Sequence, residues 1–108
     1  MRYKVRIDDV AAADLLAIYS YVAGKDSPEK AAVLLDNIER VMASLESAPG
    51  RGNYPPEMKR WAIVDFREVF FKPYRILYEI REKTVFVHAV LDGRRNCEEL
   101  LQQRLLRA

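Results

Sequence analysis

Cysteine and histidine are almost absent from this chain, which carries one of each among its 108 residues. A single cysteine, Cys97, cannot form an internal disulfide, and such sparse use of cysteine is typical of a reducing cytoplasm. One histidine, His88, with one cysteine cannot supply the usual zinc ligands or a histidine pair for acid-base chemistry. We therefore expect no metal site and no other cofactor.

Long apolar runs are also missing, because charged residues interrupt every hydrophobic segment. No stretch approaches the roughly 20 apolar residues of a membrane-spanning helix, and the first residues contain no apolar export signal. Half of the residues are hydrophobic and 31% are charged, a composition that excludes a mostly disordered chain. These features predict one cytoplasmic domain over residues 1–108, without membrane association.

Charge is distributed unevenly along the chain. Residues 1–50 contain six Lys or Arg and eight Asp or Glu, whereas residues 51–108 contain twelve and eight. A basic second half indicates an anionic partner, either nucleic acid or an acidic protein segment. A basic excess of this size is also common in proteins without such a partner, so charge alone does not identify one and the sequence motifs are needed.

The first half of the chain has the pattern of one strand and two helices. Apolar and basic residues alternate over 3–7, which predicts a short strand. Apolar residues at helical spacing predict a helix over 9–23, with Asp8 or Asp9 at its N-cap and Gly24 at its end. Ser27-Pro28 predicts the start of a second helix, which runs to about Ser47 and forms a hairpin with the first.

The second half has the pattern of strands. Turn residues over 48–56 predict a loop, and strands are expected over 61–71, 74–81 and 84–91. A helix from Asn96 to Arg107 would close the chain, with one apolar stripe of Leu100, Leu101, Leu105 and Leu106. The order predicts an α+β fold, in which the first strand joins a three-stranded antiparallel meander into a four-stranded sheet covered on one face by the hairpin.

Strand alternation assigns the side chains of the last two strands to faces. In strand 74–81 one face would carry Tyr74, Ile76, Tyr78 and Ile80, and the other Arg75, Leu77, Glu79 and Arg81. In strand 84–91 the apolar set Val85, Val87, Ala89 and Leu91 would lie opposite Phe86, His88, Val90 and Asp92. The second face of the sheet is then mixed and exposed, which is typical of a partner site.

Arginines on and after these strands are the candidate anion-binding residues. Arg75 can present a planar fork of donors to a phosphate or carboxylate, or it can form a surface ion pair with Glu79 or Glu68. Arg94 and Arg95 follow Gly93 at a turn, where they suit an anion or simply raise solubility. Arg67 and Lys72 could extend this basic patch, although each alone reads as an ordinary surface charge.

Other reactive side chains have weaker claims. A lone strand histidine such as His88 is more often packed or hydrogen-bonded than catalytic. Cys97 lies in the first turn of the last helix, where a buried or incidental thiol is expected. The aromatic residues of the second strand could stack on bases, but we assign Trp61, Phe66, Phe70 and Phe71 to the core.

The order of these motifs resembles the RelE/ParE superfamily of toxins from type II toxin-antitoxin, or plasmid stabilisation, systems. The resemblance rests on Ala13-Asp14-Leu15 in the hairpin, the Pro49-Gly50 loop, the strand Tyr74-Arg75-Ile76-Leu77-Tyr78 and the ending Val90-Leu91-Asp92-Gly93-Arg94-Arg95-Asn96. It spans roughly residues 3–106, and its specificity comes from the order of short motifs. It implies a growth-inhibiting toxin neutralised by a cognate antitoxin in a hetero-oligomer.

Members of the superfamily divide by target, and the resemblance leaves two targets open. RelE-like members cleave messenger RNA on the translating ribosome, and Arg67, Lys72, Arg75, His88 and Arg94 would then form the ribonuclease site. ParE-like members inhibit DNA gyrase. Here Asp92 stands where RNA-cleaving relatives often carry His or Tyr, and the long hairpin with the Gly93-Arg94-Arg95 ending is closer to ParE-like members.

We therefore favour a gyrase inhibitor over an mRNA interferase. A third possibility is an interaction module that has lost its toxicity. In every case the target- or antitoxin-binding residues would be Arg75, Leu77, Phe86, Asp92, Arg94 and Arg95.

Overall fold

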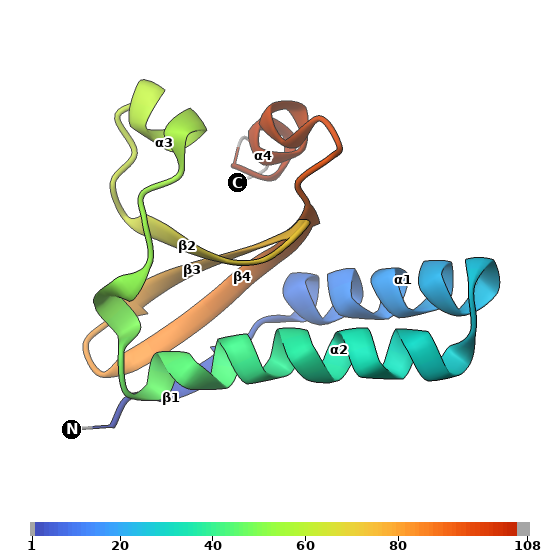
Figure 1. Cartoon of the computed structure of the whole chain (residues 1–108). Helices are drawn as coiled ribbons and strands as arrows, with labels where there is room; N and C mark the ends of the chain where they lie inside the picture. Colours follow the sequence, from blue (N-terminus) through green and yellow to red (C-terminus); the bar gives the residue numbers. More distant parts are fainter. Residues whose placement is uncertain (1, 106–108) are drawn as a thin grey trace.

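The computed structural model describes residues 2–105, and it confirms the predicted α+β order (Figure 1). The elements are β1 (Lys4–Ile7), α1 (Asp9–Lys25), α2 (Pro28–Ala43), the 3-10 turns η1 (Ser44–Glu46) and η2 (Pro49–Arg51), α3 (Pro56–Arg60), β2 (Phe66–Phe71), β3 (Tyr74–Arg81), β4 (Thr84–Asp92) and α4 (Cys97–Leu105). Among the described residues no helix is both long and apolar enough to cross a bilayer.

Side-chain N-caps fix where the two helices of the hairpin begin. The Asp8 carboxylate accepts a hydrogen bond from the Ala11 N–H at 2.9 Å, and the Ser27 hydroxyl accepts one from the Lys30 N–H at 3.1 Å. Gly24 does not end α1, which continues to Lys25. The α-helical part of α2 ends at Ala43 rather than near Ser47, and the chain then tightens into the 3-10 turn η1.

The sheet has the strand order β1-β4-β3-β2, with β1 parallel to β4 and the other pairs antiparallel. Strand β3 has the predicted bounds, but β2 begins at Phe66 and not at Trp61. Residues 61–65 turn back over α3 instead, because the Ile63 N–H bonds to the Met58 carbonyl and Ala62 adopts a positive φ of 59°.

A β-bulge at His88 overturns the predicted faces of β4. Leu77 lies opposite Ala89 and Tyr78 lies opposite Val87, so His88 has no partner in β3. The extra residue shifts the alternation by one position. Val85 and Val87 therefore face the hairpin together with Val90, while Ala89 and Leu91 face the other side, with Phe86 and His88.

Two hydrophobic cores lie on the two faces of the sheet. The first joins the sheet to the α1–α2 hairpin and includes Ile38, Leu45, Ile76, Tyr78 and Val87. The second joins the other face to α3 and α4 and includes Met58, Leu77, Ala89, Leu91 and Leu101, with Trp61 and Phe66 packed against it. Figure 1 shows α3 and α4 on the side of the sheet opposite the hairpin.

The second face is therefore covered and not an exposed mixed surface as predicted. Leu77 is 1% exposed, and Arg75 is 9% exposed. The reason is α3, a short helix between the predicted loop and the predicted second strand, which together with α4 covers this face. Of the predicted apolar stripe on α4, Leu101 is buried and Leu100 partly so, whereas Leu106 and the predicted end at Arg107 lie outside the described residues.

Candidate functional site

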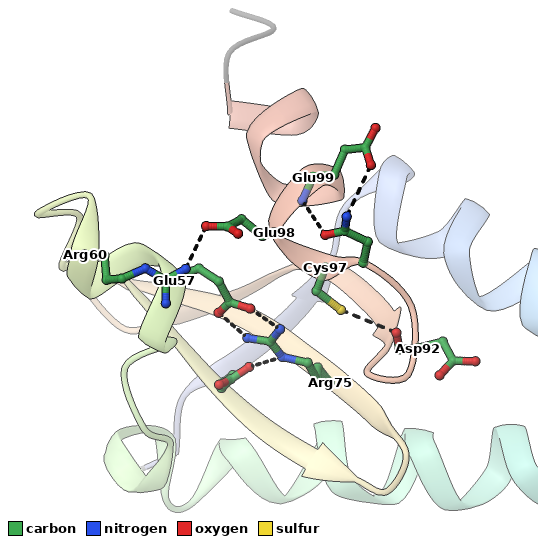
Figure 2. A network of polar contacts seen from close by, with 9 residues as sticks. Glu57, Arg60, Arg75, Asp92, Cys97, Glu98 and Glu99 are labelled. Carbon is green, nitrogen blue, oxygen red and sulfur yellow. Dashed lines mark hydrogen bonds and ion pairs between the residues drawn. The ribbon is translucent and has the colours of Figure 1, made fainter.

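Arg75 lies at the centre of a buried ion-pair cluster (Figure 2). Its Nε donates to Glu68 Oε1 at 2.7 Å, and its two terminal nitrogens donate to both oxygens of Glu57 at 2.7 and 2.8 Å. The hydrogen bonds from Arg75 hold the pKa of Glu57 below its usual value, and in turn raise the pKa of Arg75. The fork expected for an external anion is thus occupied by two carboxylates of the same chain, one of them the predicted alternative partner Glu68.

A separate, exposed ion pair ties α3 to α4. Arg60 of α3 donates to Glu98 of α4 at 2.7 Å, between side chains that are 58% and 50% exposed. Asn96 caps α4 by accepting from the Glu99 N–H at 3.1 Å, and the thiol of Cys97 donates to the Asp92 carbonyl at 3.4 Å (Figure 2). Cys97 is buried, as expected for an incidental thiol.

Arg94 and Arg95 lie at the exposed turn between β4 and α4, as predicted. The Arg94 guanidinium folds back onto Asp92, with contacts of 3.0 and 2.8 Å, and its backbone N–H donates to the same carboxylate at 2.9 Å. The Arg94 hydrogen bonds lower the pKa of Asp92. The approach of Gly93 to the Pro73 carbonyl at 2.8 Å fixes this turn at the end of β4.

His88 is held between two carboxylates. Its Nδ1 lies 2.8 Å from Asp8 and its Nε2 lies 2.9 Å from Glu79, while its ring stacks on Phe86 and meets the edge of Phe66. Both contacts are hydrogen bonds when both ring nitrogens carry a proton. Burial acts to raise the pKa of Glu79, but hydrogen bonds from Arg81 and His88 hold it below its usual value.

The predicted ribonuclease set also includes Arg67 and Lys72. Arg67 is on the hairpin face, opposite Tyr78, where it donates to the carbonyls of Gly50 and Gly52 and to the Tyr54 hydroxyl. Lys72 is exposed in the β2–β3 turn. The structure therefore does not bring the five residues of that set around one point.

A cleft of about 740 Å³ opens between the start of α1, the covered face of the sheet, α3 and α4. We call it the α1 cleft. Its apolar wall is formed by Val10, Ala13, Met58, Phe66, Leu77, Ala89 and Leu101, and its polar groups are Asp8, Asp9, Asp14, His88 and Arg104. Of the residues that line this cleft, sequence reasoning placed His88 and Leu77 among the candidate site residues.

Asp14 closes one side of the α1 cleft. Its carboxylate accepts two hydrogen bonds from Arg104 of α4, at 2.6 and 2.8 Å, and a third from the Val90 N–H of β4 at 2.9 Å. These contacts tie α1, β4 and α4 together. A polar residue on the otherwise apolar surface of α1 was the signal in the sequence, but its partner Arg104 is remote along the chain. Within residues 2–105 no set of His, Cys, Asp or Glu side chains is grouped to hold a metal ion.

Comparison with known protein families assigns most of the chain to a family. Residues 5–97 match the ParE toxin of the type II toxin-antitoxin system parDE. A search of curated proteins returned no match.

Solved structures with a similar fold include the following three. A chromosomal ParDE toxin-antitoxin system from P. aeruginosa has a chain 21% identical, with a TM-score of 0.70, and the match covers 82% of this chain and 94% of that one. The RelBE2 toxin-antitoxin complex from Mycobacterium tuberculosis has a chain 25% identical, with a TM-score of 0.55 and coverage of 83% and 96%. A mutant of the E. coli toxin RelE in the free state is 17% identical, with a TM-score of 0.64 and coverage of 99% and 98%.

The family match extends over β1, the hairpin and the whole meander, so it includes the β4 turn and all the ion pairs that involve Arg75. The fold comparison agrees with it over most of the chain. This chain belongs to the ParE toxin family of type II toxin-antitoxin systems.

Proposed function

We propose that this chain is a growth-inhibiting toxin that acts by binding and inhibiting DNA gyrase, and that a cognate antitoxin neutralises it. Membership of the ParE toxin family supports the toxin assignment. The observation that favours an inhibitor over a nuclease is the state of the basic side chains. Arg75, Arg67 and Arg94 are each engaged by acceptors of the chain itself.

Cleavage of RNA would require a different arrangement. Cations must converge on the scissile phosphate while a base lies within hydrogen-bond reach of the ribose hydroxyl. Here Arg67 lies on the opposite face of the sheet from Arg75, and both ring nitrogens of His88 are in contact with carboxylates. An inhibitor that acts by binding needs none of this convergence, and only an accessible complementary surface.

The exposed turn after β4 is the surface we assign to the target. Arg95 is exposed, and Arg94 is exposed while paired with Asp92. An anionic group of the target can compete for Arg94 at low cost, because ion pairs of exposed side chains are screened by solvent and contribute little to stability. Phe86 is half-buried, and Leu77 and Arg75 are buried. We therefore assign these three residues to the support of the sheet and not to direct contact with the target.

A ribosome-dependent mRNA endoribonuclease is the second candidate. One observation favours it: His88 lines an open cleft between two carboxylates, an arrangement that suits proton transfer. A module that binds antitoxin without toxicity is the third candidate, and expression alone separates it from the other two.

The test is to induce the protein alone in bacteria, and then to assay the purified protein for gyrase supercoiling and for cleavage of a message in a translating extract. We expect growth arrest and loss of supercoiling with an intact message. Message cleavage with normal supercoiling would identify the endoribonuclease, and normal growth with a folded protein would leave the binding module.

A pair of variants sharpens this assay. Replacing both arginines of the turn, Arg94→Ser with Arg95→Ser, should abolish inhibition of gyrase while leaving the thermal stability nearly unchanged. Arg40→Ser, which removes an exposed arginine from α2, is the matched control and should retain full inhibition. Equal activity of the two proteins would refute the assignment of the target surface.

A further inference from the structure

Helix α1 has apolar residues beyond those that pack in the hydrophobic core. Its buried side packs on the sheet and on α2 through Ala11, Leu15 and Ile18. A second stripe, formed by Val10, Ala13, Ala17 and Tyr21, is exposed, and Val10 and Tyr21 are 50% and 60% exposed. A helix with apolar residues on both sides is typical of a helix buried between two partners.

The exposed stripe is continuous with the α1 cleft. Val10 and Ala13 belong to both, so the stripe leads from the cleft along the helix. From Val10 to Tyr21 the helix rises about 16 Å, the length of three helical turns or of about five extended residues. One peptide segment could therefore fill the cleft and follow the stripe.

The charges around the α1 cleft indicate whether a bound segment should be acidic or basic. Asp8, Asp9 and Asp14, at the N-cap and start of α1, line the cleft, whereas Glu79 contacts His88 but is paired with Arg81 and does not line the cleft. Arg104 is neutralised by Asp14. Asp9 is exposed and makes no ion pair or side-chain hydrogen bond within the described residues. The rim is thus acidic, which repels nucleic acid and attracts lysine or arginine.

We propose that the α1 cleft and the exposed stripe bind an apolar and basic segment of the cognate antitoxin. Its apolar side chains fill the cleft and cover Val10 and Ala13, and its Lys or Arg side chains lie against Asp8 and Asp9. The identity of the partner rests on the proposed function, whereas the chemistry of the segment rests on the cleft. This surface is opposite in charge to the arginine turn after β4, so antitoxin and target would use different surfaces.

The chemistry is tested first with two synthetic amphipathic peptides of about 15 residues, which share their leucines and differ only in carrying lysine or glutamate elsewhere. Fluorescence anisotropy of the labelled peptides measures binding to the full chain. We expect the lysine peptide to bind at least about tenfold more tightly than the glutamate peptide. No binding of the lysine peptide, or equal binding of both, would overturn the proposal.

A matched pair of variants locates the binding. Ala13→Lys places a long cationic side chain in the cleft and should lower the affinity for the lysine peptide by about tenfold or more. Ala12→Lys adds the same charge to an exposed residue of the same helix that does not line the cleft, and should retain the wild-type affinity. Val10→Lys replaces Ala13→Lys if that variant does not fold. Equal loss in the cleft variant and its control would contradict the assigned location.

The source of the segment is tested by competition, with the polypeptide encoded beside this chain as competitor. Its excess should displace the labelled lysine peptide from the wild-type chain. Binding of that polypeptide without displacement would overturn the assignment to the antitoxin. Growth arrest is scored separately, so displacement without arrest would refute the proposed toxicity and leave the docking site standing.

Discussion

Replacing Arg75 with methionine should destabilise the fold strongly at neutral pH. The change removes the cation that joins Glu57 to Glu68 and leaves two carboxylates beside an apolar side chain. Glu68 is 3% exposed, and removing one partner of a buried ion pair costs about 3–5 kcal/mol. Since the Glu57 side chain is 15% exposed, we expect a loss at the lower end of this range, about 3 kcal/mol in the free energy of unfolding. In a domain of this size that lowers Tm by about 12–24 °C.

The loss should depend on pH. In the wild-type protein Arg75 holds the pKa of Glu57 below its usual value of 4.5. The stability that this contact contributes is therefore present above that pH, and is lost as the pH falls through the lower, folded-state pKa. The Arg75→Met variant lacks this contribution. The difference in the free energy of unfolding between the two proteins should thus narrow from about pH 7 to about pH 3.5.

Urea denaturation followed by the fluorescence of Trp61, which packs against the second core, measures both quantities. Arg60→Met is the control, because it breaks an ion pair that is exposed on both sides and should change the free energy of unfolding by less than about 1 kcal/mol. A loss in Arg75→Met no larger than in this control would refute the reasoning. A large loss of stability in Arg75→Met that is the same at neutral and acid pH would also refute the reasoning.

Three further changes probe the contacts around the site, the first two by thermal or urea denaturation and the third by amide hydrogen exchange. Tyr78→Phe leaves a buried Gly52 N–H without its 3.0 Å acceptor and should cost about 1–3 kcal/mol; a neutral result would mean that water replaces the hydroxyl. Gly52→Ala places a Cβ 2.8 Å from the Glu68 carbonyl and should cost a similar amount, whereas Gly50→Ala, which meets nothing within 4 Å, should be neutral; equal effects would contradict the packing. Asp14→Asn weakens the contacts of α1 with β4 and α4, so amide hydrogen exchange in α4 should accelerate while exchange in α2 does not; unchanged exchange in α4 would show that the ion pair is dispensable.

The regular elements could be predicted because their signals are local. Strand β3 alternates without interruption and is bounded by turns, and the N-caps of α1 and α2 are read directly from Asp8 and Ser27. The bulge at His88 has no such signal. The alternation of β4 continues through it, and what holds it is contact with Asp8 and Glu79, residues from other elements.

The environment of Arg75 was missed for a related reason. Its main partner, Glu57, lies in α3, a helix of five residues that is too short to show helical periodicity. The signal that did exist was Pro56, which occupies the first helical position, but the Pro55-Pro56 pair also reads as loop. Without α3 the second face of the sheet looks exposed, and an arginine on it looks free. The face to which Arg75 points was predicted correctly, whereas its burial was not.

The parallel pairing of β1 with β4 also governs when the fold can form. Val5 lies opposite Val85, so the strand that leaves the ribosome first must wait for the strand that leaves it last. Until then the α1–α2 hairpin has no sheet to cover. A chain cut short before β4 lacks one wall of the α1 cleft and the whole arginine turn, and it exposes the apolar underside of the hairpin to proteases. Interrupted synthesis would thus yield fragments that are both inactive and readily degraded.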